Sequence, residues 1–248
     1  MSYDPALVWA FLTALVAGVT RGFSGFGGAL IFVPLVSAAF GPKVAAPTLL
    51  VIDTLMTLPF LLPALRACIW RQVAPFAFGA VVAVPAGVWV LDHIDPMALR
   101  WALAMLSLAL LVLLISGWRH SGRHGLPTTL GVGVVAGFCG GAAQMSGPAV
   151  VAYWLGSGQP SALVRANLFG FFALVTLASG TAYAAHGMFT AEVGRLSLLL
   201  GPAYALGLYA GARSFHGASD RAYRIAAYWV IAAAALFSLP LFDALLGR

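Results

Sequence analysis

The sequence predicts an all-α protein that crosses a membrane several times. Of its 248 residues, 62% are hydrophobic and 8% are charged, and the mean hydropathy is +0.97. A soluble domain usually carries about a quarter charged residues, whereas a spanning helix needs about 20 apolar ones. Apolar runs of that length recur along the chain, without the alternating polarity that barrel strands show in segments of about 10 residues. We therefore expect a polytopic helical bundle.

Six apolar runs have the length of a membrane span. They lie at roughly 44–63, 72–91, 98–117, 166–185, 193–212 and 225–242. The runs form two groups of three, and each group follows a glycine-rich interruption of apolar helical sequence, at 20–28 and at 137–148. A backbone that stops being helical in hydrocarbon needs polar partners, and paired breaks of this kind suggest a binding site between two repeats.

The two halves of the chain are related by an offset of 119 residues. The offset aligns three pairs of glycines: Gly18 with Gly137, Gly22 with Gly141 and Gly28 with Gly147. Each glycine cluster precedes an apolar stretch and then a Gly/Pro turn, at 41–42 and 158–160. We therefore divide a single membrane domain into a first repeat at 1–118, a polar linker at 119–127 and a second repeat at 128–248.

The lengths of the segments beside the first break predict a hairpin. Residues 6–20 and 29–40 would form helices of about 22 and 18 Å, each too short for a hydrocarbon core of about 30 Å. Together they are too long for one span. A re-entrant hairpin fits both lengths and leaves each repeat with three complete transmembrane helices. Because three is odd, the two repeats are expected to be inverted.

The loop charges favour the same topology. With hairpins, one side of the membrane carries eight arginines against the single acid Asp220, and the other carries four basic and five acidic residues. Cytoplasmic loops are rich in Lys and Arg, so both termini are predicted to be periplasmic. The first apolar run begins near Ala6 without a basic segment before it, so we expect no removable signal peptide and a mature chain that begins near Met1.

Arg21 and Asp53 are the charged residues predicted to lie within the membrane. Charges there are costly and usually functional, and a guanidinium donates in a planar, bidentate manner to carboxylate, sulfonate or phosphate oxygens. Arg21 is therefore a candidate anion ligand. The alternative is that Arg21 pairs with Asp53 or caps the end of its own helix. Asp53 could instead be a coupling residue for a proton or Na⁺.

Small and neutral polar residues complete the predicted site. Glycines allow close backbone approach and positive φ, but they could also serve only tight helix packing. Asn167, beside Arg165, could present its amide to the cavity or make only a helix-terminal hydrogen bond. Besides Arg21, the candidate substrate-binding residues are Gly22, Ser24, Gly25, Gly27, Gly28, Gln144, Ser146, Gly147, Arg165 and Asn167.

Other functional classes have weaker support. Residues 22–25 read GFSG, as in intramembrane serine proteases, yet all five histidines fall at predicted helix ends or in loops, and Ala143 stands where Ser24 aligns. A protease using Ser24 is therefore a remote alternative, and we expect no enzyme. Cys68 and Cys139 have no metal-site spacing, so no metal is expected. Scattered basic residues without a recognition module argue against nucleic acid.

Several motifs resemble those of a known family. The string RGFSGFGG at 21–28 followed by Pro34, and the second-half motifs Gly147-Pro148, YWLG at 153–156 and RAN at 165–167, resemble the TauE/SafE membrane transporters. The resemblance covers nearly the whole chain. It implies transport of a small sulfur-containing anion, such as sulfite, sulfoacetate or a related sulfonate, across the bacterial inner membrane.

The resulting hypothesis is a secondary transporter that works by alternating access. Both glycine turns are expected to meet near mid-membrane, where Arg21 supplies charge while Ser24, Gln144, Ser146 and Asn167 orient the anion. An anion channel is the alternative. The expected partners are the anion and the lipid bilayer, with a homodimer left open, and no cofactor is expected beyond a coupling proton or Na⁺.

The predicted topology can be tested by cysteine accessibility. A Ser2→Cys variant should react with a membrane-impermeant maleimide from the periplasmic side, because hairpins place the amino terminus there. Reaction from the cytoplasm alone would contradict this topology.

Overall fold

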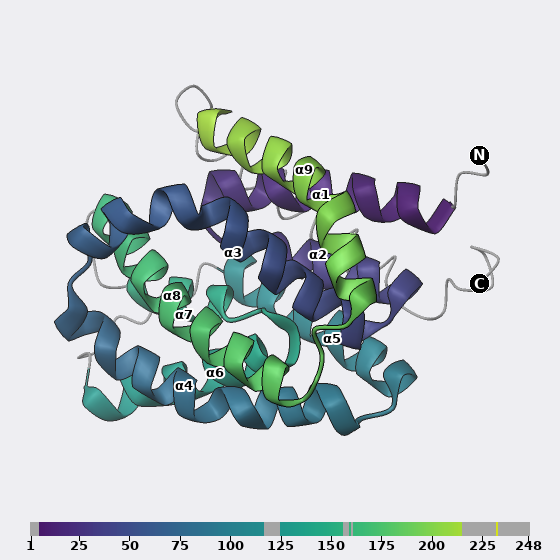
Figure 1. Ribbon diagram of the computed structural model, residues 1–248. Coiled ribbons are helices and arrows are strands. Elements are labelled where there is room, and N and C mark those ends of the chain that lie inside the picture. Colours follow the sequence, from purple (N-terminus) through teal and green to yellow (C-terminus); the bar gives the residue numbers. More distant parts are fainter. Residues whose placement is uncertain (1–4, 117–124, 156–158, 160, 215–231, 233–248) are drawn as a thin grey trace. The chain divides into compact units, whose positions relative to one another are not determined.

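The computed structural model describes residues 5–116, 125–155, 159, 161–214 and 232. All regular secondary structure within these residues is helical (Figure 1). The helices are α1 (Pro5–Ser24), α2 (Gly28–Phe40), α3 (Pro42–Ala67), α4 (Trp70–His93), α5 (Pro96–Ile115), α6 (Leu126–Ala143), α7 (Gly147–Leu155), α8 (Ser161–Ala185) and α9 (Ala191–Ser214). The all-α prediction is confirmed. Apart from residue 232, the apolar run predicted at 225–242 falls outside the described residues, as does most of the linker. Helix α6 begins within the last residues assigned to that linker.

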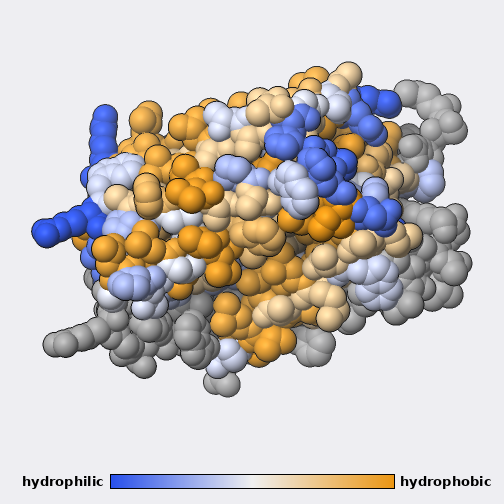
Figure 2. All heavy atoms as spheres, turned by 90° about the horizontal axis from the view of Figure 1, so that it is seen from below, coloured by the Kyte–Doolittle hydropathy of each residue, from blue (hydrophilic) through white to orange (hydrophobic). Residues whose placement is uncertain are grey.

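The described helices include seven that are long and apolar enough to cross a membrane: α1, α3, α4, α5, α6, α8 and α9. Figure 2 shows a face of the molecule on which hydrophobic side chains predominate. Large apolar side chains such as Phe78, Leu198 and Leu206 are exposed, which suits contact with lipid rather than water. The chain is therefore a multi-pass membrane protein, as predicted.

The 119-residue repeat reappears in the boundaries of the helices. The long helix before each break ends at Ser24 in α1 and at Ala143 in α6, and the short helix after it begins at Gly28 in α2 and Gly147 in α7. The next helices, α3 and α8, begin at 42 and 161. Each of these three boundaries is displaced by 119 residues, so the duplication inferred from the glycines extends to the secondary structure.

Both glycine breaks reverse the direction of the chain. In the first half, Trp9 near the start of α1 donates its indole N–H to the carbonyl oxygen of Leu35 near the end of α2, at 3.3 Å. In the second half, the hydroxyls of Thr129 in α6 and Tyr153 in α7 are 2.7 Å apart. Each bond joins the beginning of a long helix to the end of a short one. Both pairs are therefore antiparallel hairpins, whereas their re-entrant placement and the inversion of the repeats stay predictions.

The length expected for the first arm is wrong. Residues 6–20 were expected to form a helix too short to span, but α1 continues through Gly22 to Ser24 and has 20 residues, or about 30 Å at 1.5 Å per residue. Gly22 does not end α1. A glycine stands at this position because the helix packs closely against the backbone of α9 there. Among the described helices, only α2 and α7, with 13 and 9 residues, are shorter than a span. The evidence for hairpins is thus the contacts between the arms.

The chain forms two compact units, one of residues 1–56, 94–111 and 188–248 and the other of residues 57–93 and 112–187. In the first unit, α1 of the first repeat packs along α9 of the second repeat. In the other unit, α6 of the second repeat packs along α4 of the first repeat. By the 119-residue offset, α4 and α9 are equivalent helices. Each unit therefore combines elements of both repeats.

Glycines let these helix pairs approach closely. A Cβ on Gly18 or Gly22 of α1 would overlap a backbone carbonyl oxygen of α9, and a Cβ on Gly137 or Gly141 of α6 would overlap one of α4. These four residues form two of the three aligned glycine pairs of the repeat, and small residues at such spacing are typical of membrane helix interfaces. The packing interpretation therefore accounts for these glycines, Gly22 included.

The packing role of these glycines can be tested within α6. Gly137→Ala should lower the thermal unfolding temperature, because its methyl group would collide with the backbone of Ala80, and overpacking costs about 1–3 kcal/mol. Gly131→Ala is the matched control, since no atom lies within 4 Å of its added Cβ. Alanine at an open helical site should be neutral or slightly stabilising. Equal unfolding temperatures for the two variants in detergent would contradict this packing.

Candidate functional site

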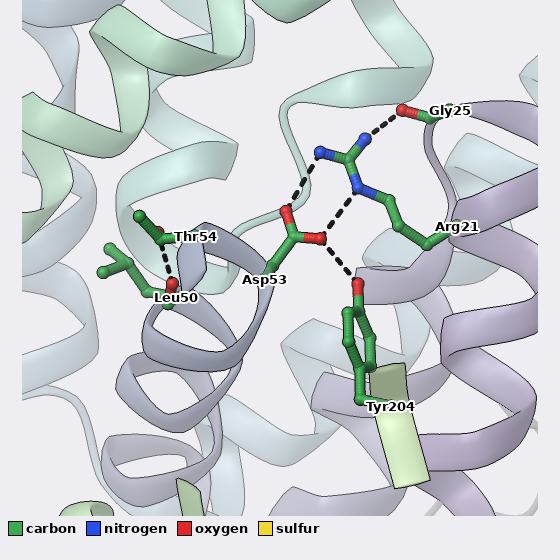
Figure 3. A network of polar contacts seen from close by, with 6 residues as sticks. All are labelled: Arg21, Gly25, Leu50, Asp53, Thr54 and Tyr204. Carbon is green, nitrogen blue, oxygen red and sulfur yellow. Dashed lines mark hydrogen bonds and ion pairs between the residues drawn. The ribbon is translucent and has the colours of Figure 1, made fainter. Parts of the chain in front are cut away.

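The two charged residues predicted within the membrane form an ion pair at the first break (Figure 3). Arg21 lies in the last turn of α1, and Asp53 lies in α3. The guanidinium donates through Nε to Oδ1 at 2.9 Å and through Nη2 to Oδ2 at 3.0 Å, which is the bidentate arrangement. The hydroxyl of Tyr204 in α9 donates to the same Oδ1 at 2.6 Å. Three helices of one unit therefore meet at a single carboxylate.

The backbone of the break brings another acceptor to Arg21. Gly25 has φ of 76° and Gly27 has φ of 89°, both in the left-handed region that glycine adopts without strain. The N–H of Gly25 closes the last turn of α1 onto the carbonyl of Arg21 at 2.9 Å. The chain then turns so that the carbonyl oxygen of Gly25 accepts from Nη1 of Arg21. The arginine therefore holds the end of its own helix as well as Asp53.

Gly28, the first residue of α2, packs directly against this ion pair. A Cβ at this position would lie 3.1 Å from Cβ of Arg21 and 3.3 Å from the hydroxyl of Tyr204. The absence of a side chain at residue 28 thus lets α2 begin beside the guanidinium. Gly27 precedes it as the N-cap and makes no side-chain capping bond.

The two ends of the ion pair differ in exposure. The side chain of Arg21 is 9% exposed and that of Asp53 is 24% exposed. A buried guanidinium needs a compensating charge, and removing one partner of such a pair typically costs about 3–5 kcal/mol. Both structural alternatives expected for Arg21, pairing with Asp53 and capping its helix, are present. Any anion that binds Arg21 therefore meets a guanidinium that already holds a carboxylate.

The second break repeats the backbone geometry of the first with different side chains. Gln144 stands where Gly25 aligns, and it has φ of 57°, which is unusual for a residue other than glycine. Its N–H closes the last turn of α6 onto Gly140 at 2.8 Å, as Gly25 does onto Arg21. The side-chain Nε2 of Gln144 donates to the carbonyl of Gly140 at 3.1 Å and to the hydroxyl of Tyr183 at 3.3 Å. The hydroxyl of Tyr183 in turn donates to the carbonyl of Gly141 at 2.8 Å. The second break is thus held by neutral groups.

Asn167 makes contacts at the start of another helix. It is fully buried in α8, where its Oδ1 accepts from the N–H of Ile69 at 2.8 Å, just before α4 begins. Its Nδ2 donates to Oε1 of Gln72 at 3.0 Å, and the same oxygen accepts from Nε2 of Gln159 at 3.0 Å. A helix-terminal hydrogen bond was one of the two expected roles of Asn167. It is present, although the helix concerned is α4 rather than its own.

The remaining candidates lie at the ends of helices. Ser24 ends α1, and its side chain is outside what the structure describes. Ser146 is buried just before Gly147, the first residue of α7, and Arg165 is half-buried near the start of α8. Arg21, Asp53 and the glycines at 22, 25, 27 and 28 belong to one unit, and the candidates from 144 to 167 belong to the other.

Tyr183, Tyr204, Gln72 and Gln159 were not predicted from the sequence. The two tyrosines are fully buried within apolar helices, and a buried phenol needs a hydrogen-bond partner. A tyrosine in the middle of an apolar span is therefore a signal that could have been used. Cys68 and Cys139 are buried free thiols, and within the described residues no group of three metal-binding side chains comes together.

Comparison with known proteins gives one match. The model of the family described as sulfite exporter TauE/SafE matches residues 10–238. No curated protein and no solved structure matches the chain. The family match includes both glycine breaks and every helix from α2 to α9, in agreement with the motifs at 21–28 and 153–167. The chain belongs to the TauE/SafE sulfite exporter family.

Proposed function

We propose that this protein is a secondary transporter of a small sulfur-containing anion, such as sulfite, sulfoacetate or a related sulfonate, in the bacterial inner membrane. The family is one of sulfite exporters, which supports the class of substrate. The observation that supports the site is the buried guanidinium of Arg21 beside a glycine break. We assign Arg21 as the ligand that supplies positive charge to the anion.

The chemistry of this guanidinium suits an oxyanion. Its planar fork can give two parallel hydrogen bonds to two oxygens of sulfite or a sulfonate, as it does here to the carboxylate of Asp53. Gly25, Gly27 and Gly28 keep side chains away from the break, and Gly28 keeps α2 close to Arg21. An apolar surround strengthens such a bond, because the local dielectric constant is low.

We assign orientation and selectivity to neutral groups. Ser24 at the first break and Gln144, Ser146 and Asn167 in the second repeat would contribute hydrogen bonds, with Gly22, Gly147 and Arg165 shaping the surround. In this proposal access alternates as one repeat rocks against the other. Both termini would be periplasmic.

The role of Arg21 can be tested by counterflow in proteoliposomes. Arg21→Lys keeps a positive charge for Asp53 but cannot form the fork. Its half-saturating concentration for sulfite should rise about 10- to 100-fold, since a hydrogen bond to a charged group contributes about 1.5–3 kcal/mol. The measurement is the initial rate of labelled sulfite entry against unlabelled sulfite inside. Sulfoacetate, isethionate and sulfate, used as competitors, would rank the substrates.

The matched control is Arg195→Lys, which makes the same change at an exposed position of α9 and should transport like the wild type. Equal half-saturation by Arg21→Lys and wild type would remove Arg21 from the site. Flux without stimulation by internal sulfite would indicate a channel, and no flux of any of these anions would refute the proposed function.

A further inference from the structure

We propose that Asp53 competes with the transported anion for Arg21, and that each anion binds together with one proton, which Asp53 accepts beside Tyr204. The inference rests on the proposed function, because it deepens the role of the same site. It assigns the coupling ion as a proton rather than Na⁺, and it gives Tyr204 a function.

The first argument is geometric. The carboxylate of Asp53 places one oxygen on Nε and the other on Nη2 of Arg21, at 2.9 and 3.0 Å. A sulfite or sulfonate group would present two oxygens to that same edge. The third nitrogen, Nη1, donates to the carbonyl of Gly25. One edge of a guanidinium holds one bidentate partner, so an anion that binds at the Nε–Nη2 edge displaces Asp53.

The second argument concerns charge. An anion bound to Arg21 while Asp53 stayed ionised would leave two negative groups beside one buried cation, and like charges at such distance disfavour ionisation of both. If Asp53 accepts a proton from the aqueous phase, its carboxyl becomes neutral and the anion takes its place opposite the guanidinium. For a singly charged anion, the net charge of the group is then zero with and without substrate, so no uncompensated charge is buried.

The neighbouring helices offer the carboxylate little other charge. Among the described residues, the titratable groups shown bonded to Asp53 are Arg21 from α1 and Tyr204 from α9, and on its own helix Lys43 and Arg66 are ten and thirteen positions away. Helix α2 has no titratable side chain, and Arg21 is the one charged residue of α1. The charged residues of α9, namely Glu192, Arg195 and Arg213, are each nine or more positions from Tyr204, which is more than two helical turns. Arg21 thus dominates the charge opposite Asp53.

The third argument is the position of Tyr204. Its hydroxyl donates to Oδ1 at 2.6 Å, and a hydroxyl can also accept, so it can stay bonded to the carboxyl in either protonation state. The proton would bind Oδ2, where it breaks the bond from Nη2 of Arg21. The neutral carboxyl then accepts from Arg21 through Nε and Oδ1, and the anion replaces it on both nitrogens. The side chain of Asp53 is 24% exposed, against 9% for Arg21, so the carboxyl is the less buried partner of the pair. Release of the anion reverses these steps.

The test is the number of protons taken up per anion bound. Full-length protein in detergent is titrated with sulfite by calorimetry in two buffers of different ionisation enthalpy, as wild type and as Asp53→Asn, which is isosteric but cannot ionise. Wild type should take up about one proton more per sulfite than Asp53→Asn, and the difference cancels the titration of sulfite itself. By linkage, the affinity of wild type relative to Asp53→Asn should fall about tenfold per pH unit once Asp53 is ionised.

A second variant tests Tyr204. In Tyr204→Phe the proton count should persist, but the midpoint of the pH dependence should rise by about one pH unit, because the carboxylate loses a hydrogen-bond donor that stabilises its ionised form. An unchanged midpoint would remove Tyr204 from the proposal.

Other outcomes overturn the inference without touching the proposed function. If wild type transports sulfite and both proteins take up the same number of protons, Asp53 is not the proton acceptor. If folded Asp53→Asn binds no sulfite, the carboxyl is required for binding and does not compete. Should Asp53→Asn fail to fold, wild-type proteoliposomes with an imposed pH gradient should accumulate sulfite on the alkaline side beyond protein-free vesicles, and no such accumulation would refute proton coupling.

Discussion

The ion pair between Arg21 and Asp53 is the interaction on which the first break depends. It joins the end of α1 to the middle of α3, and through Tyr204 it reaches α9. A helix that ends among apolar side chains leaves carbonyl groups without partners, and here the charged group that satisfies one of them is itself neutralised by the carboxylate. The same group of residues thus solves a structural problem and holds the charge that an anion would need.

Much of the fold follows from hydrophobicity and glycine. The apolar runs predict α3, α4, α5, α8 and α9, and the aligned glycines predict the duplication. The end of α1 could not be predicted, because glycine has low helix propensity and tertiary packing overrides it at Gly22. That packing depends on α9, which lies far away in the sequence, so local patterns contain no trace of it.

The candidate site shows a similar limit. The sequence identifies Arg21 and Asp53 as the charges inside apolar sequence and suggests their pairing, since few other partners exist within it. It does not reveal Tyr204, which donates a hydrogen bond to Asp53 across a sequence separation of 151 residues. Nor does it show that Asn167 meets the start of α4, because that contact exists only once α8 and α4 have packed. A polar residue within apolar sequence indicates that a hydrogen bond or ion pair is needed. The packing of the helices determines which residue is the partner.

The exchange of helices between repeats has a consequence for biogenesis. α6 can pack on α4 soon after it is made, because among the described helices only α5 is synthesised between them. By contrast, α1 cannot pack against α9 until α9 has been synthesised. Gly18 of α1 contacts the backbone of Tyr204 in α9, which lies 186 residues later in the sequence. Helix α9 therefore completes the environment of α1, which makes assembly of the arginine site depend on synthesis of the chain through α9.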